Sequence, residues 1–166
     1  MDIHSQNTIR LNLGAGHKHV EGYLNVDLCD DPEPDIKSDV KKLALPDGYA
    51  DEIMAIHLFE HLYRWEAPEA LREWRRVLKL GGLLVLEMPD LAKCVRNIAN
   101  DCNERLGIWG LFGDPGYKNP LMVHKWAWGE RELKSVLREN GFNRVRFKPP
   151  QFHKKDRDLR VEAIAE

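Results

Sequence analysis

The 166-residue chain lacks the features that define several specialised classes of protein. It has only three cysteines, Cys29, Cys94 and Cys102, and they do not form the close Cys and His pairs of a zinc motif. Reduced thiols in a cytoplasmic protein are therefore expected. No apolar run is long enough to span a bilayer. Residues 1–5 lack the basic flank and apolar core of a signal peptide.

A strong net charge of either sign is also absent. The formal net charge is -2 at pH 7, which gives no electrostatic reason to expect nucleic acid or an anionic membrane as a partner. The length suits a single domain over residues 1–166 with one core, and the 43% apolar content is that of an ordinary globular protein.

Short apolar runs separated by polar connections predict a series of strands in the first half. Residues 9–13 and 23–26 have the continuous apolar character of buried parallel strands. Shorter strands are expected at residues 35–38 and 52–56, the latter after a turn-rich segment. Residues 83–86, Leu-Leu-Val-Leu, predict the most central strand of the sheet.

Three helices and one long loop are expected in the rest of the chain. The first helix begins near Pro68, has one apolar face and ends at Gly81-Gly82. The other two cover residues 91–106 and 130–140. Residues 107–128 are rich in Gly, Pro and Trp, and a loop of this length is uncommon unless it has a function.

This order predicts an α/β fold with a Rossmann-like, mostly parallel sheet and a reduced first helix. Residues 144–147 and 159–164 form an antiparallel C-terminal hairpin. Only His17–Gly22 separate the glycines from the second strand, whereas a parallel crossover usually needs a dozen residues or more. Because parallel sheets normally have both faces covered, residues 107–128 or a second subunit in a homodimer are expected to cover one face.

The most informative motif is Leu11-Asn-Leu-Gly-Ala-Gly16 followed by Tyr23-Leu-Asn-Val-Asp27. One apolar run ends in glycines and the next in a carboxylate, which places a nucleoside across two neighbouring strand ends. The glycines allow a close approach of the ligand, and Asp27 accepts hydrogen bonds from ribose hydroxyls. A nicotinamide-dependent oxidoreductase shares these features, but the third glycine and the helix that would receive a pyrophosphate are missing.

Two histidines are candidates for catalysis. His57 stands at the expected end of the fourth strand, where it could contact cofactor or substrate, act as a general base, or only cap the following helix. His57 and His61 also have a spacing that suits a metal, but no third ligand is evident and no metal is expected. His124 is the second candidate for substrate contact or base. The tryptophans beside it either pack on a sugar ring or anchor the loop.

Taken in order, these motifs resemble class I S-adenosylmethionine-dependent methyltransferases. LNLGAG is similar to their glycine motif, NVD to the second motif with its ribose-binding acid, and Ser38-Asp39-Val40 to the third. Residues 50–62 resemble the fourth motif, and residues 74–87 the helix, Gly-Gly turn and fifth strand of the methyltransferase type 11 group. A short subgroup of predicted methyltransferases with a brief loop before NVD, often linked with polysaccharide gene sets, is similar over nearly the whole chain.

The resemblance implies S-adenosylmethionine as cofactor. It also implies methylation of a hydroxyl or amine on a small molecule or saccharide, in cell-surface polysaccharide biosynthesis. Asp39 would face the adenine amino group, and the Val40 backbone the adenine edge. The residues that the resemblance assigns to the cofactor are Asn12, Gly14, Ala15, Gly16, Asp27, Leu28, Asp39, Val40, His57 and Leu58.

The chain departs from the family pattern at the methionine end of the expected cofactor site. The usual acid two residues before the first glycine is Asn12, which can hold the loop or accept a bond from the methionine ammonium. His17-Lys18-His19 replace the third glycine. A non-catalytic nucleoside-binding module on the same fold is therefore an alternative. A basic cluster at residues 148–157 is interpreted as a solvated turn or a contact for an acidic substrate.

Overall fold

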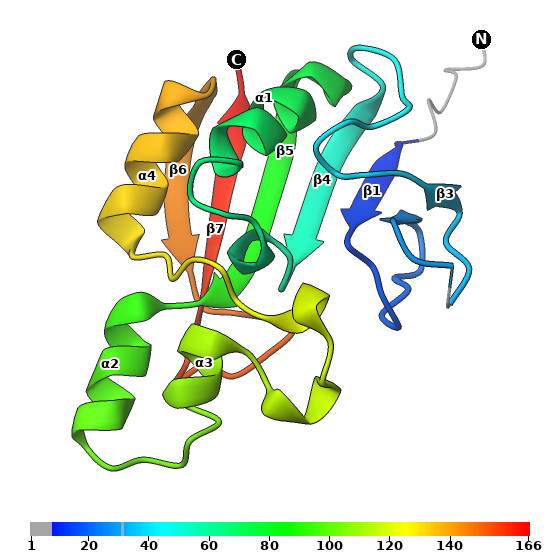
Figure 1. Ribbon diagram of the computed structural model, residues 1–166. Coiled ribbons are helices and arrows are strands. Elements are labelled where there is room, and N and C mark those ends of the chain that lie inside the picture. The colour runs from blue at the N-terminus through cyan, green and yellow to red at the C-terminus, as the bar shows by residue number, and fades with distance from the viewer. Residues whose placement is uncertain (1–7, 31) are drawn as a thin grey trace, which may run out of the picture.

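A seven-stranded mixed sheet forms the centre of the computed structural model, which describes residues 8–30 and 32–166 (Figure 1). The segment considered for a signal peptide lies outside these residues. The strands are β1 (Arg10–Leu13), β2 (Leu24–Asp27), β3 (Ile36–Lys37), β4 (Ala50–Ile56), β5 (Leu78–Pro89), β6 (Phe142–Lys148) and β7 (Asp158–Ala165). Their order is β3-β2-β1-β4-β5-β7-β6, with β7 antiparallel to both neighbours and the first five strands parallel. The predicted Rossmann-like fold with an antiparallel C-terminal hairpin is confirmed.

The helices lie on one face of the sheet and beyond its carboxyl edge. They are α1 (Ala67–Val77), α2 (Leu91–Ala99), α3 (Ile108–Phe112) and α4 (Glu130–Glu139), with the 3-10 turns η1 (Phe59–His61), η2 (Pro115–Tyr117) and η3 (Pro120–Met122). Helices α1 and α4 pack on the sheet, whereas α2 and α3 lie past the end of β5 (Figure 1). No helix in the described ranges is long and apolar enough to cross a membrane.

The apolar stripe of α1 forms much of the core. Pro68 lies in its first turn, where a missing amide hydrogen costs nothing. Leu71 and Trp74 are completely buried and face the alternate side chains of β1 and β4, such as Leu11 and Ile53. The Trp74 Nε1 donates to the Val40 carbonyl at 2.8 Å, so this buried indole is satisfied and ties α1 to the segment after β3.

The opposite face of the sheet carries ion pairs instead of helices. Glu52 on β4 accepts from the Tyr23 hydroxyl at 2.6 Å and lies 3.6 Å from Arg10 on β1. Glu162 on β7 pairs with Lys148 at 2.5 Å and with Arg160 at 3.2 Å. No helix of residues 8–30 and 32–166 packs on this face. The charged groups on this face can stay hydrated. The face is therefore not covered by residues 107–128, as one of the two expectations had it, but is compatible with solvent.

Three predicted boundaries or placements are corrected. Helix α1 ends at Val77, and Gly81-Gly82 lie inside β5, where Gly81 has a φ of +80° and four residues of β5, 79–82, lie opposite the single residue Asp51 of β4. Helix α2 ends at Ala99 instead of residue 106, because Asp101 turns to a φ of +49°. The segment 107–128 lies against η1 and not over the open face, as the hydrogen bond from the Lys125 amide to the Glu60 carbonyl shows.

The connection between β1 and β2 contains no helix, as predicted. Its two turns are closed by bonds from the Lys18 amide to the Ala15 carbonyl at 2.8 Å and from the Tyr23 amide to the Val20 carbonyl at 3.1 Å. Ten residues therefore suffice to return the chain to a parallel neighbour.

Candidate functional site

The glycine turn after β1 presents open backbone at the carboxyl edge of the sheet. Gly14 has a φ of +64°, and its amide donates to the Val26 carbonyl at 2.8 Å. A Cβ there would lie 2.7 Å from Leu58 Cδ1, so conformation and close packing both require glycine. Gly16 has a φ of +46°, and no described atom beyond its chain neighbours lies within 4 Å of the position of a Cβ. A ligand can therefore approach the backbone closely at Gly16.

Asp27 ends β2 with its carboxylate directed at this turn. Its Oδ2 accepts from the Gly16 amide and its Oδ1 from the Cys29 amide, both at 2.9 Å. These bonds orient a half-buried carboxylate that keeps further lone pairs for a ligand. Leu28 follows with 54% of its surface exposed. An acceptor for sugar hydroxyls beside a free apolar side chain fits the adenosine part of S-adenosylmethionine.

The residues expected to face the adenine lie next to Asp27. The Ser38 amide donates to the Asp27 carbonyl at 2.9 Å, which places Asp39 and Val40 at the same edge. The Asp39 Oδ1 accepts from the backbone amide two residues later at 2.8 Å. The Val40 carbonyl is bonded to Trp74, so only its remaining backbone and side chain are free for a base.

Asn12 holds the short loop in place. This side chain is 3% exposed, and its Nδ2 donates to the Lys18 carbonyl at 2.9 Å and to Asn25 Oδ1 at 3.0 Å. The same oxygen of Asn25 accepts from the Val20 amide at 3.1 Å. Of the two roles considered for Asn12, the structure shows the first, in which it braces the loop.

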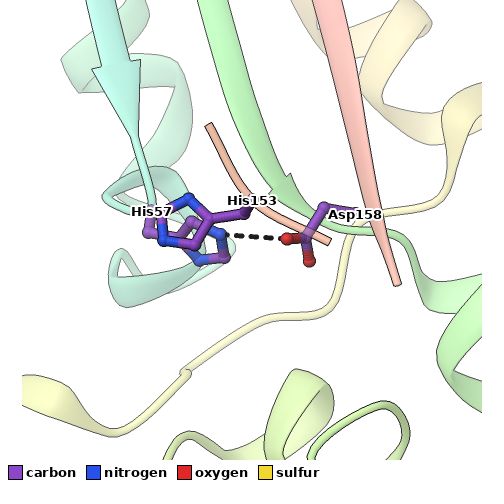
Figure 2. Close-up of side chains that lie close together, drawn as sticks. All are labelled: His57, His153 and Asp158. Carbon is purple, nitrogen blue, oxygen red and sulfur yellow. Dashed lines mark hydrogen bonds and ion pairs between the residues drawn. The ribbon is translucent and has the colours of Figure 1, made fainter. Parts of the chain in front are cut away.

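His57 follows β4 in an uncommon backbone conformation with a φ of +53°. Its Nδ1 donates to Glu60 Oε1 at 2.8 Å, and its Nε2 to Asp158 Oδ2 at 3.3 Å (Figure 2). Burial lowers the pKa of His57, but the two carboxylates raise it further, to about 9. Because an imidazolium with both N–H groups bound cannot accept a proton, the geometry argues against the general-base role expected for His57.

The two carboxylates that hold His57 are themselves buried. Glu60 is 2% exposed and Asp158 is fully buried. Asp158 also accepts from Arg157 Nε at 2.6 Å and from the Lys154 amide at 3.1 Å. Burial raises the pKa of each carboxyl group. Hydrogen bonds from His57 and Arg157 nevertheless hold the pKa of Asp158 far below its usual range. The His57 charge lowers the pKa of Glu60 to about 2.

The loop between β6 and β7 reaches the glycine turn. The Glu87 carboxylate accepts from the amides of residues 151–153 at 2.8 to 2.9 Å, which fixes this loop on β5. The His153 ring lies 4.1 Å from that of His57 (Figure 2), and its Nε2 contacts the Lys18 ammonium. Burial, then the charges of His57 and Lys18, lower the pKa of His153 to about 4. Part of the predicted basic cluster is therefore built into the site.

His124 approaches Glu60 from the loop between η3 and α4. Its Nδ1 donates to the Gly110 carbonyl at 2.9 Å, and its Nε2 lies 3.9 Å from Glu60 Oε1. Its ring centroid is 4.8 Å from that of His61. Burial lowers the pKa of His124, so the imidazole is neutral and its Nε2 carries a lone pair. The two histidines predicted as catalytic are thus brought together around one carboxylate.

The two tryptophans beside His124 differ in their surroundings. Trp128 is fully buried and stacks on Phe59 with a centroid distance of 4.9 Å. Trp126 is 39% exposed and donates from Nε1 to Glu132 at 3.2 Å. The anchoring role therefore describes Trp128, while Trp126 stays at the surface.

Three members of this charged network were not predicted as site residues: Lys18, Glu87 and Asp158. His153 and Arg157 belong to the basic cluster that was interpreted as a solvated turn or a contact for an acidic substrate. The sequence did contain a weak signal for buried charges. Glu87 interrupts an apolar strand, and Arg157-Asp158 place opposite charges directly before the last apolar strand. Only the pairing of β5 with β7 brings these charges to His57.

Comparison with known proteins identifies the type of domain. Residues 17–86 match the family model described as a methyltransferase domain, which is less than half of the chain. No curated protein sequence matches. The fold is similar to that of an S-adenosylmethionine-dependent methyltransferase from Thermotoga maritima, described as a possible histamine N-methyltransferase. The TM-score is 0.68 and the identity 14%, over 95% of this chain and 82% of that one.

Two further structures give the same result. An S-adenosylmethionine-dependent methyltransferase from Archaeoglobus fulgidus aligns with a TM-score of 0.65 and 19% identity, over 95% of this chain and 86% of that one. One from Methanosarcina mazei has a TM-score of 0.66 and 16% identity, over 96% and 93%. At such identities the likeness establishes the fold. Together with the match of residues 17–86, it confirms the predicted resemblance to class I S-adenosylmethionine-dependent methyltransferases.

Proposed function

We propose that this chain, which carries a methyltransferase domain on the class I fold, transfers a methyl group from S-adenosylmethionine to a hydroxyl or amine of a small molecule or saccharide. One observation supports this most strongly. The glycine turn with Asp27 and the cluster of His57, Glu60 and His124 lie along the same carboxyl edge, where ligands of open α/β sheets bind. Cofactor-holding groups and acceptor-facing groups are thereby neighbours.

The residues proposed to hold the cofactor are those predicted from the motifs. The open backbone of the glycine turn and the oriented Asp27 carboxylate fit its nucleoside. When bound, S-adenosylmethionine supplies a methyl group that a positive sulfur makes electrophilic. The proposed set is Asn12 through the loop it braces, Gly14, Ala15, Gly16, Asp27, Leu28, Asp39, Val40, His57 and Leu58.

The chain itself must orient the acceptor and remove its proton. His57 serves as a positioning group, because Glu60 and Asp158 fix both of its nitrogens. His124 is the proposed base, since it is neutral and has a free Nε2. Alignment of the acceptor with the methyl group needs no covalent step on the protein.

Exposed aromatic rings near His61 support a saccharide acceptor. Tyr63 and Trp65 are 41% and 74% exposed and stack with a centroid distance of 4.5 Å. Because the Tyr63 ring is stacked on Trp65 and lies under the Lys125 ammonium, the flat apolar faces left for a sugar ring are those of Trp65 and Trp126. A place in cell-surface polysaccharide biosynthesis belongs to this proposal. So does a cytoplasmic location, with which the free cysteines are compatible.

Methyl transfer to a library of sugars, sugar nucleotides and amines tests the proposal. Replacement of His124 by glutamine is expected to lower kcat for a hydroxyl acceptor by about 100-fold, as for loss of a general base. Affinity for S-adenosylhomocysteine should stay unchanged, because His124 is assigned to the acceptor side. Equal loss of cofactor affinity would contradict that assignment. Replacement of the exposed His19 by glutamine is the control.

The non-catalytic binding module remains the second candidate. The observation that favours it is the contact of Lys18 with His153. Lys18 lies in the loop after the glycine turn, where Asn12 replaces the acid usual in the family. Tight binding of S-adenosylhomocysteine with no turnover on any acceptor would support this alternative.

The structure supports the proposed homodimer less strongly than the sequence does. The open face of the sheet carries the ion pairs of Glu52 and Glu162, so burial there would desolvate charges. A dimer would have to keep these pairs intact within its interface.

A further inference from the structure

Glu60 has a carboxylate oxygen without a partner. The side chain is 2% exposed, and its Oε1 accepts from His57 Nδ1 at 2.8 Å. Its Oε2 is buried and has no hydrogen-bond partner among the residues that the structure describes. An ionised buried oxygen of this kind is costly unless a ligand satisfies it. The unsatisfied oxygen therefore marks a position that a cation or a hydrogen-bond donor would stabilise.

Two histidines beside Glu60 have their rings fixed by backbone carbonyls. The His61 Nδ1 lies 3.2 Å from the Val123 carbonyl, and the His124 Nδ1 lies 2.9 Å from the Gly110 carbonyl. Each Nδ1–H therefore donates to a carbonyl, and each Nε2 keeps a lone pair. This is the arrangement that orients histidines for metal binding. The ligand atoms of Glu60, His61 and His124 all lie within 4.8 Å of one another.

A second group of possible ligands, His57, His153 and Asp158, differs in its charge (Figure 2). Both oxygens of Asp158 already accept hydrogen bonds from Arg157. The Lys18 ammonium contacts His153. Protein cations thus satisfy this group, whereas among the described residues no lysine or arginine pairs with Glu60, whose side-chain contacts are to His57 and His124. Of the two groups, that of Glu60 is therefore the better candidate for binding a metal ion.

We propose that Glu60, His61 and His124 form a binding site for a divalent transition-metal ion. Two imidazole nitrogens and one carboxylate oxygen are a donor set that suits Zn²⁺ and related ions. A bound ion would draw these atoms to roughly 2.0–2.2 Å from itself. Three protein ligands leave coordination positions for water or for an oxygen of the acceptor. The site goes beyond the proposed methyl transfer and exists whether or not the chain is catalytic. With an ion bound, His124 Nε2 would be a ligand, and water on the ion would replace His124 as the base.

Metal titration of the full chain, treated with a chelator and kept free of S-adenosylmethionine, tests the site. Calorimetry with Zn²⁺ and the visible spectrum with Co²⁺ should show one ion bound per chain. H61A and H124A should each weaken Zn²⁺ binding by more than about 100-fold. Loss of a group that only supports a metal ligand weakens binding by roughly 10- to 100-fold. His57→Asn, which disturbs the partner of Glu60 and tolerates a positive φ, should fall within that range.

His153→Ala, in the other group, and His19→Ala, at the surface, are matched controls that should bind as the wild type does. Melting curves in chelator check that each variant is folded. NMR of the wild type labelled at histidine adds a test that needs no variant, since Zn²⁺ should shift the Nε2 signals of two histidines. Binding that is equal in wild type and H61A, loss only in His153→Ala, or no histidine shift would each overturn the proposal.

Discussion

Replacement of Asp27 by alanine is expected to weaken binding of S-adenosylhomocysteine by about 100-fold to 10,000-fold. The carboxylate is the acceptor proposed for two ribose hydroxyls, and hydrogen bonds to a charged group contribute about 1.5–3 kcal/mol each. The variant also loses the acceptor of the Gly16 and Cys29 amides, so the glycine turn becomes less well oriented. Calorimetric titration of the folded variant measures the effect.

Asp30→Ala is the matched control for Asp27→Ala. Asp30 lies three residues later, pairs with Lys37 at the surface and has no assigned contact to the cofactor. Its removal should leave the affinity unchanged. If Asp27→Ala is folded and binds as tightly as Asp30→Ala, the ribose contact is misassigned.

The Asp158→Ala variant is expected to lose about 3–5 kcal/mol of unfolding free energy, the usual effect of removing one partner from a buried ion pair. The change leaves Arg157 and the His57 imidazolium without their shared carboxylate and removes the acceptor of the Lys154 amide. Such a loss is a large part of the roughly 5–15 kcal/mol of a typical domain. Urea denaturation measures it.

The difference between wild type and Asp158→Ala should depend on pH. Because the folded pKa of Asp158 lies below its unfolded value, its contribution is fully present at neutral pH. It is lost as the pH falls from about 4 towards the folded pKa. The exposed Asp156 provides the control variant, Asp156→Ala, with little expected change. A loss below about 1 kcal/mol at neutral pH for Asp158→Ala would show that the pair with Arg157 is not a stabilising centre.

Local patterns were sufficient to predict much of the fold. The apolar runs that became β1, β2 and β4 follow from residue type alone, and the brief segment before Tyr23 correctly predicted the missing first helix. The prediction that the first helix ends at Gly81-Gly82 was wrong. Paired glycines stop a helix but also permit a bulge in a strand, and the pairing with β4 decides between the two. The polar second face was not foreseen, because it depends on register between β1, β4, β5 and β7.

The candidate site was predictable only where its residues are close in sequence. The glycine turn, Asp27 and the turn that contains Glu60 and His61 belong to short motifs. The contact between His57 and Asp158 joins residues 101 positions apart, and the role of each changes once they meet. Taken alone, His57 has the properties of a base, but between two carboxylates it is a fixed cation. No local pattern contains that information.

Binding of S-adenosylhomocysteine to the purified wild-type chain tests the central claim most directly. At a ligand concentration 100-fold above Kd, binding adds about 2.7 kcal/mol of stability. For a domain of this size, that raises Tm by roughly 5–10 °C. The account predicts this shift, together with binding heat in calorimetry, for S-adenosylhomocysteine and S-adenosylmethionine but not for NAD. Absence of both heat and shift with either methionine-derived ligand would contradict it.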